Sequence, residues 1–228
     1  EYSVGEGNEL TSLLLEIDGL SWNNNTSELL GSTIEFGDIK LHVLAPDHDV
    51  AYENKPKEPD ELGVRSDDWY IDLRTLIDNV DDDDIDEGGT NSQSIIILAE
   101  CEGKKLLLPG DSTPKKLCDA LQSYNKTNGT PLELDFMKLP HHGSTRNVTK
   151  NILNEVTCSN FIISTKKNNK YYFPNKETIA KLIRYRDSAD KAINVYFNYQ
   201  ESLDVLGITA EELTENNINL NVCNEFNF

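Results

Sequence analysis

Short apolar runs alternate with longer amphipathic stretches over most of the chain. From residue 91 onward, β-branched apolar runs alternate with segments whose apolar positions are three and four residues apart. The first kind of segment is typical of a buried strand, and the second of a helix packed on a sheet. The alternation predicts a layered α/β protein. The expected strands lie at residues 94–99, 105–108, 134–139, 160–164 and 192–197.

The clearest helix signal begins at Thr113, which is suited to cap a helix, followed by Pro114, which suits its first position. The apolar residues that follow fall on one helical face. Further helices are expected after Asn175, which can cap one, and where Thr209 and Glu212 form a capping-box pattern. The apolar positions that support these helices are Leu117, Ala120, Leu121, Tyr124, Ile152, Leu153, Val156, Ile179, Leu182 and Ile183.

The N-terminal part of the chain is more polar. Residues 33–36 and 39–45 alternate apolar and polar positions around a Gly-Asp pair, which predicts two strands joined by a tight turn. Residues 46–90 are rich in Pro, Asp, Glu and Gly and predict a long surface excursion, with a short helix around Trp69–Ile77. Their acidic run, Asp81–Asp84, is expected to be a solvated loop, since it lacks the spacing of a calcium-binding EF-hand.

Length and composition limit the class of protein. The 228 residues allow one large domain or two small ones, and no run of 18 apolar residues predicts a membrane span. The start of the chain carries no signal-peptide pattern. Four widely spaced cysteines form no Cys-x-x-Cys, which argues against a zinc knuckle and favours reduced thiols. These features predict a cytoplasmic protein with no membrane partner.

The net charge of −19 is unevenly distributed. Residues 146–186 carry nine basic and two acidic side chains, and they form the only basic stretch of an otherwise acidic chain. A local positive field beside a site favours an anionic substrate. A solvated basic helix face is the alternative interpretation.

Two polar motifs directly follow predicted strands. Gly110-Asp111 comes after the strand at 105–108, and His141-His142 after the strand at 134–139. Sites in α/β proteins are built at strand ends, because the sheet holds the strand end rigid while loops surround the open side. Imidazole and carboxylate suit zinc, manganese or iron, and a carboxylate can bridge two cations. Each motif alone also fits a simpler interpretation: Gly110-Asp111 as a turn, and His141-His142 as one packed and one exposed histidine that point in different directions on extended backbone.

Together and in this order, the motifs resemble the metallo-β-lactamase-fold hydrolases of the ComEC type. The resemblance covers about residues 32–185 and is strongest over 91–175. It implies an αββα sandwich, of which this chain forms the C-terminal portion. The motifs that carry the resemblance are Asn91-Ser92-Gln93-Ser94, Leu108-Pro109-Gly110-Asp111, Leu139-Pro140-His141-His142-Gly143-Ser144, Ser164 and Asn169-Lys170-Tyr171-Tyr172-Phe173-Pro174.

The resemblance also implies roles for single residues. Asp111 would bridge two metal ions, and one of the two histidines would complete a metal shell. We favour His142 as that ligand, with His141 in contact with the substrate or the leaving group. His48 stands where many members of the fold supply a further metal ligand, although members of the ComEC type often lack it. The residues expected to line the substrate site are Ser144, Arg146, Lys166 and Asn168.

The chain departs from the family in two places. The defining His-x-His-x-Asp-His motif is absent, and residues 1–32 contain no histidine. Phe173 stands where the family usually has histidine before proline. Three explanations remain open: the C-terminal part of a longer enzyme, a relative that has lost catalysis, or an accidental resemblance. On the first, residues 1–32 are the remainder of the N-terminal half, 33–200 the C-terminal half with an acidic insertion at 46–90, and 201–228 an extension.

The sequence therefore predicts the C-terminal part of a metal-dependent hydrolase, a phosphodiesterase or nuclease that acts on single-stranded nucleic acid or a nucleotide. Two divalent cations, zinc or manganese, would generate the attacking hydroxide. The missing ligands would come from an N-terminal half of the same enzyme or from a partner chain. The alternative is a catalytically inactive interaction module, in which the acidic residues 78–87 bind a partner.

Overall fold

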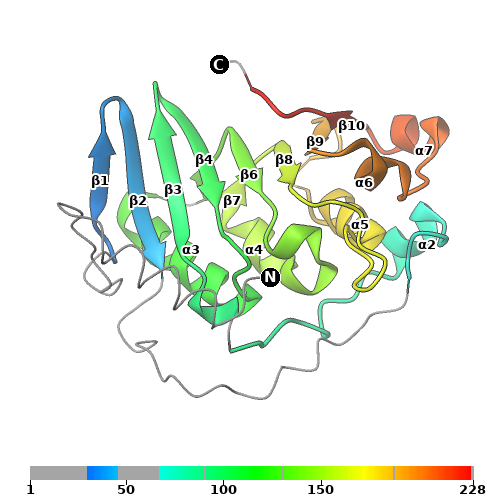
Figure 1. Ribbon diagram of the computed structural model, residues 1–228, viewed down its shortest axis with the longest axis horizontal. Coiled ribbons are helices and arrows are strands. Elements are labelled where there is room, and N and C mark those ends of the chain that lie inside the picture. The colour runs from blue at the N-terminus through cyan, green and yellow to red at the C-terminus, as the bar shows by residue number, and fades with distance from the viewer. Residues whose placement is uncertain (1–29, 46–66, 90, 130, 187, 227–228) are drawn as a thin grey trace, which may run out of the picture.

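The computed structural model describes residues 30–45, 67–89, 91–129, 131–186 and 188–226, and a large mixed sheet dominates it (Figure 1). Two further strands, β5 (Leu132–Glu133) and β7 (Val156–Thr157), form a small separate sheet. In spatial order, the eight strands of the large sheet are β1 (Thr33–Phe36), β2 (Ile39–Ala45), β3 (Ile96–Cys101), β4 (Lys104–Leu108), β6 (Phe136–Lys138), β8 (Asn160–Ile163), β9 (Ile193–Phe197) and β10 (Ile218–Val222).

The large sheet has an antiparallel half and a parallel half. Strands β1 to β4 form an antiparallel meander, and Gly103, with φ of 78°, makes the turn between β3 and β4. From β4 onward each strand pairs parallel to the next, through β6, β8, β9 and β10. Parallel neighbours need crossover connections, which the helices supply. The parallel half therefore collects the C-terminal ends of β4 and β6 at one edge of the sheet.

Most helices fall where the amphipathic pattern predicts them, but the helix at Gln200–Asp204 was not predicted, and Val156, expected on a helical face, lies in β7. Thr113 occupies the N-cap of α3 with Pro114 in its first turn, although no side-chain cap bond forms there. The predicted capping box of Thr209 and Glu212 is present at the start of α7. The helices are α2 (Leu73–Asp78), α3 (Pro114–Asn128), α4 (Lys150–Asn154), α5 (Lys176–Tyr185), α6 (Gln200–Asp204) and α7 (Ala210–Glu215), with short 3-10 turns η3 (Asn91–Gln93), η4 (His141–Gly143) and η5 (Thr145–Asn147). No helix among these described residues is long and apolar enough to cross a membrane.

One face of the sheet packs against helices α3, α4 and α5. Residues on this face are register partners across the strands, and they are almost fully buried together with the apolar stripes of the three helices. They form a single core. Its strand and helix members include Leu98, Leu107, Met137, Phe161, Val195, Leu117, Leu121, Ile152 and Ile179.

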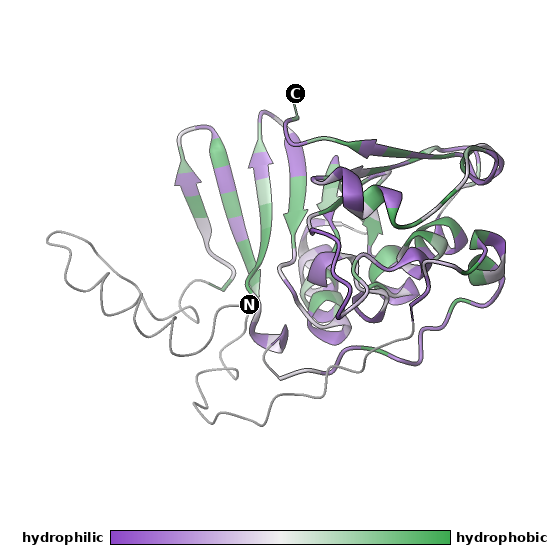
Figure 2. Cartoon of the chain, turned by 45° about the vertical axis from the view of Figure 1, so that its right-hand side comes forward, coloured by the Kyte–Doolittle hydropathy of each residue, from purple (hydrophilic) through white to green (hydrophobic). Residues whose placement is uncertain are grey.

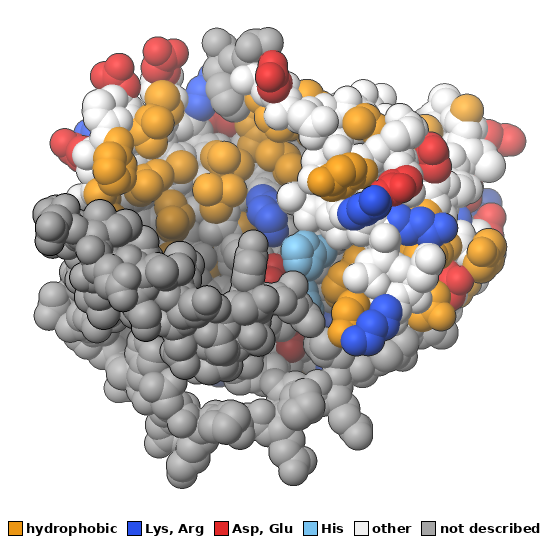
Figure 3. Space-filling model, in the orientation of Figure 1, with side chains coloured by type: hydrophobic (Ala, Val, Ile, Leu, Met, Phe, Trp, Pro, Cys, Tyr) orange, Lys and Arg blue, Asp and Glu red, His pale blue; other side chains and the backbone are white. Residues whose placement is uncertain are grey.

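Among the described residues, the opposite face of the antiparallel half is apolar and partly exposed, although Val43 on this face is buried. Phe36 and Ile39, which pair across β1 and β2, are 62 % and 43 % exposed, and Ile95 beside β3 is 48 % exposed. Figure 2 shows alternating hydrophobic and hydrophilic bands along these strands, and Figure 3 shows hydrophobic side chains gathered over this part of the sheet. We call this the open apolar face.

The α/β class is confirmed, since a large sheet is flanked by helices. The described residues contain one large sheet covered on one face, and not the two stacked sheets of an αββα sandwich. Residues 201–228, predicted as an extension, contribute α6, α7 and the edge strand β10. His48 and most of the predicted N-terminal remainder, residues 1–32, lie outside the described residues.

Candidate metal site

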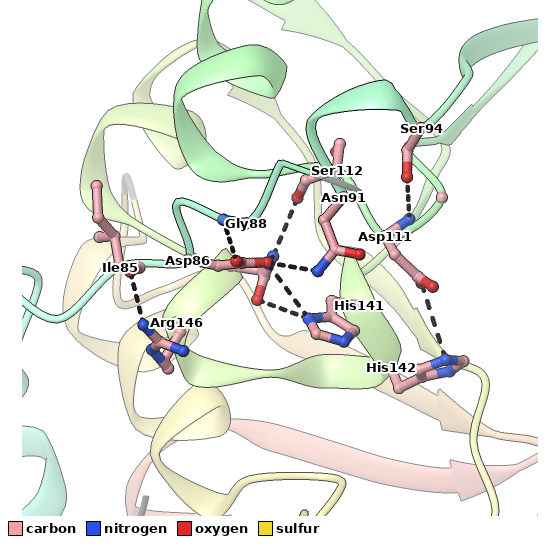
Figure 4. Close-up of polar contacts among 12 residues, drawn as sticks. Ile85, Asp86, Gly88, Asn91, Ser94, Asp111, Ser112, His141, His142 and Arg146 are labelled. Carbon is pink, nitrogen blue, oxygen red and sulfur yellow. Dashed lines mark hydrogen bonds and ion pairs between the residues drawn. The ribbon is translucent and has the colours of Figure 1, made fainter. Parts of the chain in front are cut away.

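The two predicted motifs meet at the C-terminal edge of the parallel half. Strands β4 and β6 are parallel neighbours, so the segments that follow them leave the sheet side by side. The backbone N–H of His141 donates to the carbonyl of Gly110 at 3.2 Å, which joins the two loops directly. Figure 4 shows Asp111 and His142 pointing toward one another, with His141 beside them.

Asp111 and His142 form the core of the candidate site. Their closest atoms, Asp111 Oδ1 and His142 Nε2, are 3.8 Å apart, and the side chains are 42 % and 43 % exposed. His142 Nδ1 lies 3.0 Å from the carbonyl oxygen of Ser164, which can only accept, so Nδ1 carries the proton. In the neutral ring Nε2 carries the lone pair and lies on the side of the Asp111 carboxylate, the arrangement of a metal-ligating histidine whose other nitrogen is held by a backbone carbonyl.

A glycine places Asp111. Gly110 has φ of 60°, and a Cβ added there would lie 3.3 Å from the Ser94 side chain. The backbone N–H of Asp111 also donates to Ser94 Oγ at 3.3 Å. The Asn-Ser-Gln-Ser and Gly-Asp motifs thus form one structural unit. Ser94 of the first motif packs against Gly110 and accepts the backbone N–H of Asp111 in the second.

The His-His-Gly turn has a left-handed backbone at three consecutive residues. His141, His142 and Gly143 have φ of 44°, 59° and 80°. This conformation is uncommon for residues with a side chain, and surrounding contacts must maintain it. One histidine is packed and the other is exposed, as the simpler interpretation expects: the His141 and His142 side chains are 12 % and 43 % exposed, with ring centroids 6.0 Å apart. The assumption of extended backbone is wrong, because both residues are left-handed.

Helix α5 and the loop before it maintain this turn. The carbonyl of Gly143 accepts from Thr178 Oγ1 at 2.8 Å and from the backbone N–H of Asn175 at 3.3 Å. Asn175 Oδ1 in turn accepts the N–H of Thr145 at 2.9 Å. Asn175, predicted as a helix cap, occupies the N-cap position of α5. Its side chain makes no cap hydrogen bond and instead binds the segment that follows the His-His-Gly turn.

His141 is buried against Asn147 and Asp86. Its Nδ1 lies 3.0 Å from Asn147 Oδ1 and 3.6 Å from Asp86 Oδ2. Burial opposes protonation of His141, but its interactions with Asp86 and Asn147 outweigh burial and raise its pKa above the ordinary 6.5. Burial likewise opposes ionisation of Asp86, and hydrogen bonds from His141, Asn147 and Asn91 outweigh it and hold the pKa of Asp86 well below 3.8.

Asp86 belongs to what we call the acidic segment, residues 81–87, and the prediction of a solvated loop is wrong for it. Three alternate aspartates bind the region that follows the His-His-Gly turn. Asp82 lies 2.9 Å from the buried ammonium of Lys181 and accepts the N–H of Lys150 at 3.0 Å. Asp84 accepts from Arg146 Nε at 2.9 Å, and Asp86 is 6 % exposed.

The predicted substrate-lining residues do not all face the site. Ser144 is buried. Arg146 is held by Asp84 and by the carbonyl of Ile85 at 3.0 Å, so its guanidinium structures the acidic segment. Asn168 Oδ1 accepts two backbone N–H groups of its own loop. Lys166 is 71 % exposed and 3.5 Å from Glu201.

Residues 166–173, which we call the basic loop, lie beside the histidines. Lys167 lies over the Trp69 ring at 5.2 Å and Lys170 over the Tyr171 ring at 4.5 Å. Tyr171 stacks on Phe173, whose ring meets that of His141 edge-on at 5.2 Å. Figure 3 shows histidine side chains at the surface between hydrophobic and basic groups.

A lysine approaches Asp111 from the other side. Lys138 Nζ donates to the carbonyl of Leu139 at 3.2 Å. Burial lowers the pKa of Lys138 below 10.5, while the nearby Asp111 carboxylate favours its charged form. A cation at this position adds to the positive surroundings of the candidate site.

The donor set fits a divalent cation in part. A carboxylate oxygen and an imidazole nitrogen face each other at a partly exposed surface, and both are ligand types that zinc and manganese accept. Within the described ranges, no three His, Cys, Asp or Glu side chains converge to hold a metal ion. The described residues therefore supply two candidate ligands, and a complete shell needs others.

Comparison with known proteins yields one distant similarity. No protein-family profile matches the chain. The chain is 28 % identical over 120 residues to Recombination protein 2 of Haemophilus influenzae. The matched stretch covers 50 % of this chain and 14 % of that protein, so the chain corresponds to a small part of it. This similarity is consistent with a distant relation to Recombination protein 2 over half of the chain.

Proposed function

We propose that this chain is the C-terminal part of a metal-dependent hydrolase that cleaves phosphodiester bonds. The observation that carries the proposal is the pair formed by Asp111 and His142. The Asp111 carboxylate and His142 Nε2 face one another across 3.8 Å at the edge of a parallel sheet, with Nδ1 held by the Ser164 carbonyl. A lysine–aspartate or arginine–aspartate pair at the same place would suggest only a surface ion pair.

The chain's own residues would bind the cation and orient the substrate. Asp111 and His142 would hold a divalent cation, which in such sites supplies a hydroxide and polarises the bond that is cleaved. His141 Nε2, on the ring edge opposite Nδ1 and its partners, would be the place where a proton is held near the leaving oxygen. Lys138 and the basic loop would balance the charge of a phosphate.

The remaining ligands would come from an N-terminal half or a partner chain. The open apolar face supports this part of the proposal, because an apolar sheet surface with 62 % of Phe36 exposed is typical of a surface that packs against another element. The resemblance to the ComEC type assigns the missing ligands to a His-x-His-x-Asp-His motif. We therefore expect the 228-residue chain alone to bind zinc or manganese weakly.

A single-stranded nucleic acid or a nucleotide fits the site better than a duplex. The basic loop offers lysines interleaved with aromatic rings, the combination that contacts phosphates and stacked bases. The net charge of −19 opposes the extended phosphate contacts of duplex binding. A short or flexible substrate needs only the local positive field.

A catalytically inactive interaction module is the competing function. Two observations favour it: no complete ligand set occurs among the described residues, and Phe173 occupies the position where the family usually has histidine. In this case the fold persists as a scaffold, and Asp111 and His142 form an ordinary surface pair.

Metal content and hydrolysis separate the two functions. The chain is combined with the N-terminal half or partner chain, and zinc and manganese are measured by elemental analysis beside hydrolysis of a single-stranded oligonucleotide. Asp111→Asn and His142→Ala should each lower bound metal and reduce hydrolysis ~100-fold or more. Asp119→Asn, which removes an exposed carboxylate paired with Lys115 on α3, is the matched control and should change neither. Absence of metal, or hydrolysis that survives both site variants, would reject the hydrolase.

A further inference from the structure

We infer that Asp86 is a positioning residue for His141 and acts through the side chain of Asn147, an inference that rests on the proposed function of the site. Asp86 touches no open part of the site. It is 6 % exposed and lies in the acidic segment, 55 residues before the histidine in the chain. Its role follows from the hydrogen bonds that connect it to the imidazole.

The Asn147 amide has one orientation that satisfies its surroundings. Its Nδ2 donates to Asp86 Oδ2 at 2.8 Å and to the carbonyl of Ser112 at 3.1 Å. Both partners are acceptors only, so the amide nitrogen must face them and the amide oxygen must face the other way. Asn147 is fully buried, so water does not compete for these positions.

The orientation of Asn147 fixes the proton on His141. Asn147 Oδ1 lies 3.0 Å from His141 Nδ1 and can only accept, so Nδ1 is the protonated nitrogen. In the neutral ring, Nε2 is then left with a lone pair. His141 and His142 thus adopt the same tautomer by different means, one through a side-chain network and the other through the Ser164 carbonyl.

Asp86 is held firmly enough to set this network. Its Oδ1 accepts the N–H of Gly88 at 2.8 Å, and its Oδ2 accepts from Asn91 Nδ2 at 2.8 Å. Its own N–H donates to the carbonyl of Arg146 at 3.0 Å. Figure 4 shows the carboxylate between Gly88 and Asn91, directed toward His141. Phe173 meets the His141 ring edge-on, and the Asp86–Asn147 network fixes the imidazole through its Nδ1 atom.

The tautomer of His141 can be measured in the nitrogen-labelled full chain without metal or substrate. Long-range proton–nitrogen NMR correlations of the imidazole rings, at a pH where both are neutral, should show Nδ1 protonated in His141 and His142. Asp86→Asn keeps the shape of the side chain but removes an acceptor, and Asn147→Ala removes the bridge. Both should shift His141 toward the Nε2-protonated form that predominates in free histidine and leave His142 unchanged. Asp84→Asn, in the same segment but bonded to Arg146, is the control and should shift neither ring.

The outcomes separate this inference from the proposed function. A folded Asp86→Asn or Asn147→Ala variant whose His141 tautomer matches the unmodified chain would overturn the positioning role, whatever the activity. In the assembled enzyme, the same variants should lower kcat ~10- to 100-fold with little change in KM. A tautomer shift in a protein that shows neither metal nor hydrolysis would retain the positioning role and reject the hydrolase. Hydrolysis with no tautomer response would reject the positioning role alone.

Discussion

The acidic segment and the basic loop flank the same pair of histidines and behave in opposite ways. In the acidic segment, alternate aspartates bind Lys181, Arg146 and Asn147. In the basic loop, Lys166 and Lys167 are exposed, and the loop's lysines contact ring faces, the Tyr171 hydroxyl and the Glu201 carboxylate. The acidic segment stabilises the site through its contacts with Lys181, Arg146 and Asn147, and the basic loop lies exposed beside the histidines.

This difference shows that the charge of a run does not reveal its role. Both runs look like solvated surface in the sequence. What separates them is whether each charge meets a partner fixed by the fold, as Lys181 does for Asp82. Buried partners restrict geometry, whereas exposed charges contribute little to stability and remain available to a ligand.

The largest expected effect is the loss of Lys181. Its side chain is fully buried, and its ammonium donates to the carbonyls of Thr145 and Val148 and pairs with Asp82. Lys181→Met leaves these acceptors without a cation, and the free energy of unfolding should fall by ~4 kcal/mol, measured by urea denaturation. Lys166→Met, an exposed lysine of the basic loop, should change it by less than ~0.5 kcal/mol. Equal changes in the free energy of unfolding for the two variants would contradict the contrast between buried and exposed charges.

The pH dependence of stability tests the role of a second buried carboxylate, that of Asp68. Asp68 is 6 % exposed, and burial raises its pKa to about 6, although the Glu177 N–H donates to it at 2.8 Å. The folded pKa exceeds the unfolded value of 3.8, so the folded state holds this proton more tightly. Stability from this group is present below about pH 4 and is lost as pH rises toward 6, by up to ~3 kcal/mol.

Asp68→Asn should remove this loss, because an amide oxygen can still accept from Glu177. Urea denaturation at several pH values should show the variant gaining stability relative to the unmodified chain between about pH 4 and pH 6. Parallel pH profiles for the two proteins would contradict the assignment. Asp86 has the opposite sign, since its folded pKa is depressed, and its contribution is lost only as pH falls below about 4.

The smallest effect on stability is expected in the basic loop. Lys167→Ser combined with Lys170→Ser removes two contacts with aromatic rings and should lower the free energy of unfolding by ~1 kcal/mol or less. Binding of a single-stranded oligonucleotide should weaken, and the dependence of log K on log salt should fall by roughly 1. Fluorescence anisotropy at several salt concentrations measures both. An unchanged salt dependence would show that the loop does not contact phosphate.

The sequence predicts the sheet and the strand ends well. Periodicity located strands β1 to β4, β6, β8 and β9, and the two motifs follow neighbouring parallel strands at one edge. It missed β10, because residues 192–197 were expected to form the last strand. Both predictions depend on local patterns and on the rule that parallel strands end together. The helix that begins at Pro114 was predicted for the same reason, since residues close together in the sequence determine both its start and its apolar face.

What could not be predicted depends on contacts between distant residues. Asp86 accepts a hydrogen bond from Asn147, which lies 61 residues further along the chain. The sequence around each residue is no different from that around a solvated polar residue. The left-handed backbone at His141 and His142 is maintained by Asn175 and Thr178, so an analysis of adjacent residues favours extended backbone there. Arg146 was assigned to substrate for the same reason, because its partner Asp84 lies far away in the chain.

The open apolar face has a consequence for handling the protein. Among the strands that the structure describes, β1 is an edge of the sheet, and Phe36 on β1 and Ile39 on β2 are exposed beside that edge. An uncovered hydrophobic edge is a template for pairing with another chain, and natural proteins usually protect it. The chain purified by itself should therefore self-associate as its concentration rises and bind hydrophobic dyes. Co-expression with whatever covers β1 and β2 should restore solubility, which offers a search for that partner that requires no enzymatic assay.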